Sequence, residues 1–284
     1  MTKLMLGTVQ FGLDYGISNK SGQTARDEVE KILKNAKENA VDYLDTARGY
    51  GESEQILGSL SELMTESKVV TKVSSLEGDL DKINTSFKHS LKDLRVESVH
   101  GLLLHDPSDL NDKSVQELVK LKEKGKVSKI GVSVYSLDEI DNALKFDDLD
   151  LIQVPMNILD QRLLKSNHLK KMKEKKIEIH VRSLFLQGLL FMNPGEVSSF
   201  FKPIQKQLTR LNEEAKKREI SVLSILLGFA KSITEIDKFV VGVNTSEQFL
   251  QIIEALKEET TGINYGEYSC ANENILNPAK WNNQ

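Results

Sequence analysis

The chain has 284 residues, of which 39% are hydrophobic and 28% are charged, a composition typical of a folded α/β protein and unlike that of a disordered or fibrous chain. Its 38 basic and 42 acidic residues are mixed along the whole length and give a net charge of -4, so we expect no nucleic-acid partner.

The cellular location is predicted from what the sequence lacks. Cys270 is the single cysteine and cannot form an internal disulfide, which is typical of a reducing compartment. The first apolar run is broken at Gly7, too early for a signal peptide. No apolar stretch reaches the ~18 residues that indicate a transmembrane helix. We therefore expect a cytoplasmic protein with no membrane partner.

Short apolar runs recur along the chain, and most of them precede an amphipathic segment. The runs are nearly continuous in apolar residues, which is typical of parallel strands that are covered on both faces. In chain order the predicted strands are Leu4 to Gly7, Val41 to Asp45, Lys68 to Lys72, Ser98 to His105, Ile130 to Ser133, Leu151 to Val154, Ile177 to Arg182 and Phe239 to Gly242.

Helices are predicted between these strands wherever apolar residues repeat at helical spacing. In Arg26 to Asn39, for example, Val29, Ile32 and Ala36 fall on one face. The other predicted helices are Ser53 to Leu60, Leu80 to Leu94, Ser114 to Glu123, Leu137 to Ala143, Ser166 to Lys175, Lys206 to Lys217 and Ser246 to Ala255.

Strand-helix units that follow one another without a linker predict a single-domain (β/α)8 TIM barrel of the α/β class over residues 1–284. Met192 to Pro203, which contains two prolines, is predicted as a long loop. Residues 260–284 are predicted as a C-terminal tail over the barrel mouth. An open Rossmann sheet is the alternative, but Gly7-Thr8-Val9-Gln10-Phe11-Gly12 follows the first strand in place of the expected glycine fingerprint.

Three consecutive predicted strands end in a titratable residue, namely Asp45, Lys72 and His105. In a barrel the carboxyl ends of the strands meet at one mouth, where catalytic residues lie. The loop after Asp45 brings Tyr50 over the same opening. Singly, each residue has an ordinary explanation, such as a structural ion pair, a loop start or a turn tyrosine. Because all four residues are expected at the same rim of the barrel, a single active site explains them better than four unrelated structural roles.

The chemistry of these four residues favours proton transfer. A tyrosine with a pKa near ~10 needs a neighbour that favours its phenolate, and Lys72 can supply the positive charge. Asp45 can keep Lys72 charged, while His105 can orient a carbonyl oxygen beside Tyr50. Lys72 could instead form a Schiff base in a barrel lyase or isomerase, which is a further alternative.

The motif Asp45-Thr46-Ala47-x-x-Tyr50-Gly51-x-Ser53-Glu54, followed by Lys72 and His105 at later strand ends, resembles the aldo-keto reductase family over essentially the whole chain. This resemblance implies that Asp45, Tyr50, Lys72 and His105 form the catalytic tetrad. It also implies an oxidoreductase that uses NAD(P)H, bound across the barrel mouth, to interconvert a carbonyl and an alcohol.

The resemblance further implies the residues that contact the cofactor. Ser133 and Gln153 would bind the nicotinamide carboxamide, and Arg182 stands where many members have a stacking aromatic residue. The full set of implied contacts is Gly7, Thr8, Phe11, Asp45, Ser133, Gln153, Arg182, Ser183, Leu184, Gln187, Gly188, Gly242, Asn244, Thr245 and Gln248.

Two departures from the family pattern concern the cofactor. Val134 stands where many members have an Asn that binds the carboxamide. The basic residues that hold the 2'-phosphate of NADPH correspond here to Val243 or Asn244 and to Phe249. A phosphate gains much from charge-assisted hydrogen bonds, so the sequence leaves NADPH and NADH both open.

The leading hypothesis is therefore a reductase of a small carbonyl compound, with Tyr50 as the proton donor. The alternative is a regulatory module on the same fold that binds the cofactor with little turnover. No metal-ligand spacing is found, so His89, His100 and His180 are interpreted as packing or surface residues, and His168 as a solvated one.

The substrate is the least constrained feature of the sequence. The polar tail residues Asn264 and Asn272, together with a resemblance to reductases of bacterial surface-sugar pathways, favour a sugar or sugar derivative and a role in carbohydrate metabolism. The aromatic residues expected around the substrate are Phe185, Phe191, Phe200, Phe201, Tyr265, Tyr268 and Trp281. Neither the physiological direction nor the oligomeric state follows from the sequence.

Overall fold

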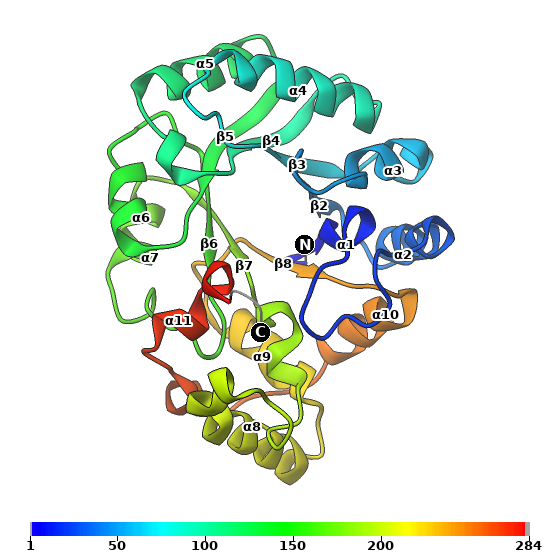
Figure 1. Cartoon of the computed structure of the whole chain (residues 1–284), viewed down its shortest axis with the longest axis vertical. Helices are drawn as coiled ribbons and strands as arrows, with labels where there is room; N and C mark the ends of the chain where they lie inside the picture. Colours follow the sequence, from blue (N-terminus) through cyan, green and yellow to red (C-terminus); the bar gives the residue numbers. More distant parts are fainter. Residues whose placement is uncertain (1, 282–284) are drawn as a thin grey trace.

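The structure, a computed structural model, describes residues 2–281 and is a closed barrel of parallel strands (Figure 1). Each strand pairs with the next in sequence, and β8 pairs with β1 to close the cylinder. The strands are β1 (Leu4–Gly7), β2 (Tyr43–Asp45), β3 (Lys68–Val73), β4 (Val99–Leu104), β5 (Val127–Ser133), β6 (Leu151–Pro155), β7 (Glu178–Arg182) and β8 (Lys238–Gly242). The predicted TIM barrel is confirmed, and the open sheet is excluded.

Most of the helices surround the strands on the outside of the barrel (Figure 1). The helices are α1 (Val9–Gly12), α2 (Arg26–Glu38), α3 (Ser53–Ser59), α4 (Asp81–Leu94), α5 (Asp112–Glu123), α6 (Leu137–Ala143), α7 (His168–Glu174), α8 (Gln205–Arg218), α9 (Val222–Ser232), α10 (Ser246–Ala255) and α11 (Glu273–Leu276). The short helices α1 and α11 lie inside the ring of helices in the view of Figure 1. All eight predicted helices are present. The sequence missed α9 because that helix is buried on nearly every side and carries no polar stripe.

Local signals explain where several helices begin and end. The Asn111 side chain accepts hydrogen bonds at the start of α5, and Ser136 and Glu139 form a capping box at α6. After α5 the chain turns at Gly125, whose φ of 67° is in the left-handed region that glycine tolerates.

The barrel interior has its own apolar layer, separate from the larger core between strands and helices. Five strands each contribute one residue to it, namely Met5, Tyr43, Val70, Leu103 and Leu151. Such layers make the centre of a TIM barrel a packed core and not a channel.

Two histidines pack around Tyr43, as expected. The rings of His100 and His180 meet it edge-on, with centroids 5.2 and 6.2 Å away. His168 was predicted to be solvated, and this was wrong. It is buried, and its ring nitrogens lie 2.9 Å from Ser166 Oγ and 3.2 Å from Asp141 Oδ1.

The segment from Met192 to Pro203 is less irregular than predicted, because it runs into a 3-10 helix at Ser199–Ile204. There Phe201 packs edge-on against Trp281 of the tail, with ring centroids 5.0 Å apart. The tail also bonds to the loop after β6, since Cys270 N donates to Leu159 O at 2.9 Å. The tail therefore contacts both the segment before α8 and the loop after β6.

None of the helices within residues 2–281 combines the length and apolar character needed to cross a bilayer.

Candidate active site

Three neighbouring strands place the predicted tetrad around one buried ion pair. Lys72 Nζ, from β3, donates to Asp45 Oδ2 at the end of β2 at 2.7 Å and to the Thr46 carbonyl at 2.9 Å. The same ammonium lies 3.4 Å from Tyr50 Oη. Lys72 and Asp45 are 1% and 3% exposed, so water does not screen their interaction. The four residues that the sequence indicated are thus brought together, with His105 following β4.

His105 lies beside the phenol, and its ring meets that of Tyr50 edge-on with centroids 5.8 Å apart. Burial lowers the pKa of His105 to about 4, and the charge of Lys72 adds to the effect. The imidazole is therefore neutral at pH 7. In one tautomer it can donate a hydrogen bond to a substrate oxygen without carrying a charge.

The electrostatics of Tyr50 differ from the expectation that Lys72 lowers its pKa. Burial raises the pKa of Tyr50 and the Asp45 carboxylate adds to the rise, while Arg182 opposes it. Burial likewise lowers the pKa of Lys72, and Asp45 opposes that shift. Desolvation outweighs the nearby charges because it disfavours every charged form in the pocket. The phenol consequently stays protonated at neutral pH, as a proton donor must.

Gln153 completes the environment of Asp45. Its Nε2 donates to Asp45 Oδ1 at 2.7 Å, so both carboxylate oxygens have a partner. On the other side, Gln153 Oε1 lies 3.5 Å from Ser133 Oγ. These contacts fix the carboxylate that in turn holds Lys72.

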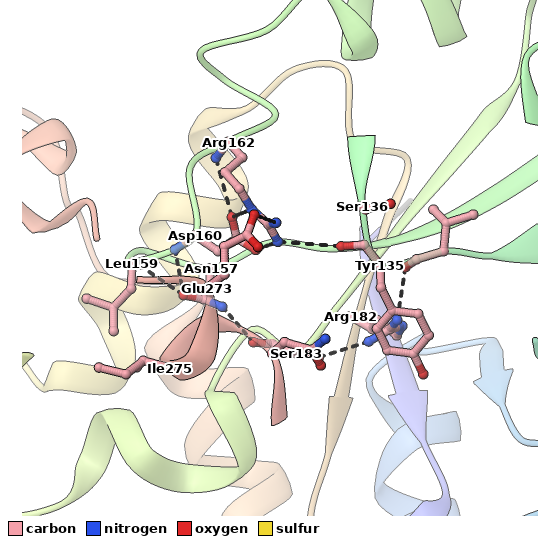
Figure 2. A network of polar contacts seen from close by, with 12 residues as sticks. Tyr135, Ser136, Asn157, Leu159, Asp160, Arg162, Arg182, Ser183, Glu273 and Ile275 are labelled. Carbon is pink, nitrogen blue, oxygen red and sulfur yellow. Dashed lines mark hydrogen bonds and ion pairs between the residues drawn. The ribbon is translucent and has the colours of Figure 1, made fainter. Parts of the chain in front are cut away.

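The Arg182 guanidinium, which the sequence predicts to stack on the nicotinamide, lies over the ring of Tyr135, 4.1 Å from the ring centroid. It is also tethered on three sides. Arg182 Nε donates to Ser133 Oγ at 3.2 Å, and Nη2 donates to Val134 O at 3.0 Å. Nη1 donates to Ser183 Oγ at 3.3 Å (Figure 2). The guanidinium is therefore a fixed positive charge beside the tetrad.

Figure 2 shows that polar contacts continue outward from this arginine. Asn157 Nδ2 donates to Ser183 O at 3.2 Å. Arg162 bonds to Asp160 and reaches Tyr135 O at 3.5 Å. The loop after β6 thus braces both the backbone of Tyr135 and that of Ser183, which follows β7.

A cavity of about 1240 Å³ opens above the tetrad. Its walls include most of the predicted site residues, namely Gly7, Thr8, Asp45, Tyr50, His105, Gln153, Arg182, Ser183, Leu184, Gln187, Gly188, Gly242, Asn244 and Gln248. Four predicted residues lie outside the lining. Lys72 and Ser133 are buried behind it, Phe11 belongs to the core, and Thr245 caps α10.

Aromatic residues at the cavity were only partly foreseen. Phe185 and Phe191 line it, but the other five proposed aromatic residues do not. Phe200, Phe201 and Trp281 pack on one another, Tyr265 packs on Phe229, and Tyr268 is buried. Tyr15 and Tyr135 line the cavity and were missed. Their positions after the carboxyl ends of β1 and β5 were the signal that could have identified them.

Two loops meet over the cavity in what we call the Ser18–Gln187 bridge. Both the amide and the hydroxyl of Ser18 donate to Gln187 O, each at 3.4 Å. The second loop is unusual, because Leu186, Gln187 and Gly188 all have positive φ. A Cβ on Gly188 would lie 1.7 Å from Ser18 Oγ, so glycine is required for the close approach.

Comparison with known proteins identifies the family. A model of the Aldo/keto reductase family matches residues 3–265. The chain belongs to this family. It is 27% identical over 178 residues to the aldo-keto reductase YhdN of Bacillus subtilis, a match that spans 56% of the chain and 53% of YhdN. It is 23% identical over 282 residues to the uncharacterized oxidoreductase YqkF of the same organism, spanning 90% and 91% of the two chains.

Solved aldo-keto reductase structures share the fold of this family member. A putative aldo-keto reductase from Pseudomonas aeruginosa matches with a TM-score of 0.68 and 20% identity, covering 90% of this chain and 89% of that one. The thermostable aldo-keto reductase Tm1743, crystallised with the inhibitor epalrestat, matches with a TM-score of 0.73 and 20% identity, covering 92% of each chain.

The residues present fit the nicotinamide dinucleotide that this family uses. The cavity exceeds the ~300–1,000 Å³ of ordinary ligand pockets, which leaves room for a cofactor and a substrate together. Within the described residues, the buried Oε1 of Gln10 has no hydrogen-bond partner, although Gln10 lines the cavity. A Cβ on Gly242 would lie 2.4 Å from that oxygen, so a side chain there would fill the space beside it.

Proposed function

We propose that the protein is an NAD(P)H-dependent oxidoreductase that reduces a carbonyl to an alcohol, or the reverse, with Tyr50 as the proton donor. The observation that carries this proposal is the contact of Tyr50 Oη with the buried Lys72–Asp45 pair, beside a neutral His105, at a cavity large enough for cofactor and substrate.

The nicotinamide, when bound, supplies the hydride that adds to the carbonyl carbon. The chain's own residues handle the oxygen. The Tyr50 hydroxyl and His105 hold the carbonyl oxygen by hydrogen bonds, and Tyr50 transfers its proton to that oxygen as negative charge develops there. Lys72, whose charged form Asp45 favours, stabilises the phenolate that remains until it is reprotonated. Reversing each transfer oxidises the alcohol.

The Schiff-base alternative conflicts with the position of Lys72. Its side chain lies outside the cavity lining and is already bonded to Asp45 Oδ2 and Thr46 O. A substrate carbonyl in the cavity meets Tyr50 first, so the tyrosine is the group positioned for chemistry.

For the substrate we propose a small hydroxylated carbonyl compound, such as a sugar derivative. Asn264 and Asn272, which suggested this class, do not line the cavity. The proposal now rests on polar groups near the tetrad, chiefly the Tyr15 and Tyr135 phenols and the Arg182 guanidinium. These can donate hydrogen bonds to hydroxyl groups.

The test is turnover of a panel of aldehydes, ketones and sugar-derived carbonyls with NADH and with NADPH. We expect the wild type to oxidise either cofactor with at least one carbonyl, and Tyr50→Phe to lose at least 100-fold in kcat, within the range that general acids contribute, about 10²–10⁴. Tyr268→Phe, which lies outside the cavity lining, is the matched control and keeps the bulk of the activity. Cofactor binding without turnover of any carbonyl by the wild type would favour the regulatory module.

A further inference from the structure

The end of the cavity away from the tetrad has an acidic wall. Glu247, Glu254 and Glu258 line it from α10 and the segment that follows, and Glu219 lines it from the loop between α8 and α9. Among the described lining residues, Arg182 alone carries a positive charge, and its bonds to Ser133 and Val134 keep it at the tetrad end.

The N-terminus of α10, which faces this acidic end, is already bonded to a carboxylate of the chain itself. Glu28 Oε1, from α2, accepts hydrogen bonds from the amide and the hydroxyl of Ser246, each at 2.7 Å. These bonds lower the pKa of Glu28 to about 2, so the group is ionised at all ordinary pH values. The Glu28 carboxylate therefore offsets the positive end of the α10 dipole.

The neighbouring amides are also bonded within the chain. Asn244 N donates to Gln248 Oε1 at 2.8 Å, and Gln248 N donates to Thr245 Oγ1 at 3.1 Å. An anion arriving at this turn would have to displace these partners while lying close to the Glu28 charge. Helix N-termini that bind phosphate offer free amides instead.

We propose, on the basis of the proposed function, that the site takes NADH in preference to NADPH and that Glu28 is a specificity-determining residue. With the nicotinamide at Tyr50, an extended dinucleotide reaches along the continuous cavity and places its adenosine at the acidic end. There the 2'-phosphate of NADPH, which carries nearly two negative charges, meets carboxylates and no cation among the lining residues, because Lys31, which pairs with Glu28 at 3.0 Å, lies outside the lining. The neutral 2'-hydroxyl of NADH avoids this repulsion.

The experiment measures dissociation constants of NADH and NADPH by calorimetry, without any substrate. We expect the wild type to bind NADH at least 10-fold more tightly. Glu28→Gln removes the charge but keeps an oxygen that can accept a hydrogen bond from Ser246. We expect this variant to bind NADPH more tightly and so to lower the ratio of the NADPH to the NADH dissociation constant at least 5-fold. Glu30→Gln, on the same helix and paired with Lys34, is the control and leaves the ratio unchanged.

A thermal melt establishes that Glu28→Gln is folded, and Glu247→Gln, on the cavity wall, provides a second variant that should shift the ratio the same way. Equal or tighter binding of NADPH by the wild type would overturn the preference. An unchanged ratio in both variants would overturn the role of these carboxylates. If neither dinucleotide binds, the proposed function itself fails, which is a different result from binding of both with equal affinity.

Discussion

Replacing Lys72 by Met separates the structural role of the buried ion pair from its catalytic role. Lys72→Met keeps most of the side-chain volume but leaves Asp45 Oδ2 without the ammonium that donates to it at 2.7 Å. The Asp45 side chain is only 5% exposed, so the carboxylate left without its partner is poorly solvated. Removing one member of a buried pair costs about 3–5 kcal/mol. At ~2–4 °C per kcal/mol, the melting temperature should fall by roughly 10 °C.

The assay is urea unfolding of the wild type, Lys72→Met, and the double variant Asp45→Asn/Lys72→Met. We expect the double variant to regain stability, because no uncompensated charge remains buried. Turnover should stay low in both variants, since the phenolate of Tyr50 lacks its neighbouring cation. A loss of less than about 1 kcal/mol in Lys72→Met would show that the pair is well solvated, and the reasoning about burial would be refuted.

Three further variants follow from the structure. Burial lowers the pKa of His100 from 6.5 to about 4, so the folded state loses stability as the pH falls from about 6.5 to about 4. In His100→Gln the free energy of unfolding should depend less on pH over this range, as measured by urea titrations at several pH values. Gly188→Ala should disturb the Ser18–Gln187 bridge and speed cofactor release several-fold in stopped-flow displacement, whereas Gly195→Ala, whose nearest neighbour would be 3.6 Å away, should not. Arg182→Met removes a charge that lowers the pKa of Tyr50, so the pH profile of alcohol oxidation should move to higher pH.

Each of these variants has an outcome that contradicts its physical basis. An unchanged pH dependence in His100→Gln would mean that this histidine titrates alike in the folded and unfolded states. Equal release rates for Gly188→Ala and wild type would show that the bridge does not retain the cofactor. If the pH profile of alcohol oxidation moved to lower pH in Arg182→Met, the guanidinium would raise the pKa of Tyr50 and not lower it.

The barrel and the tetrad could be predicted because their signals are local. Apolar runs give the strands, and a titratable residue at the end of a strand marks the mouth, as Asp45, Lys72 and His105 do. The helix α9 escaped prediction because its middle, from Ser224 to Ala230, is entirely buried and its sequence is apolar with few polar residues to mark a solvent face.

Features that depend on three-dimensional packing could not be read from the sequence. Trp281 and Tyr268 were assigned to the substrate site, but neither lines the cavity, and Trp281 packs on Phe201 instead. The shift in the pKa of Tyr50 depends on how deeply the pocket is buried, which spacing along the chain does not report. The bond between Glu28 and Ser246 joins residues 218 positions apart and has no local signature.

The most direct test of Tyr50 as the proton donor is a single-turnover experiment with reduced cofactor bound beforehand. Stopped-flow absorbance follows hydride transfer to a saturating carbonyl, and cofactor affinity is measured on the same preparation. We expect Tyr50→Phe to bind the cofactor as the wild type does and to transfer hydride at least 100-fold more slowly, in line with the ~10²–10⁴ attributed to a general acid. Hydride transfer at the wild-type rate in Tyr50→Phe would contradict the assignment.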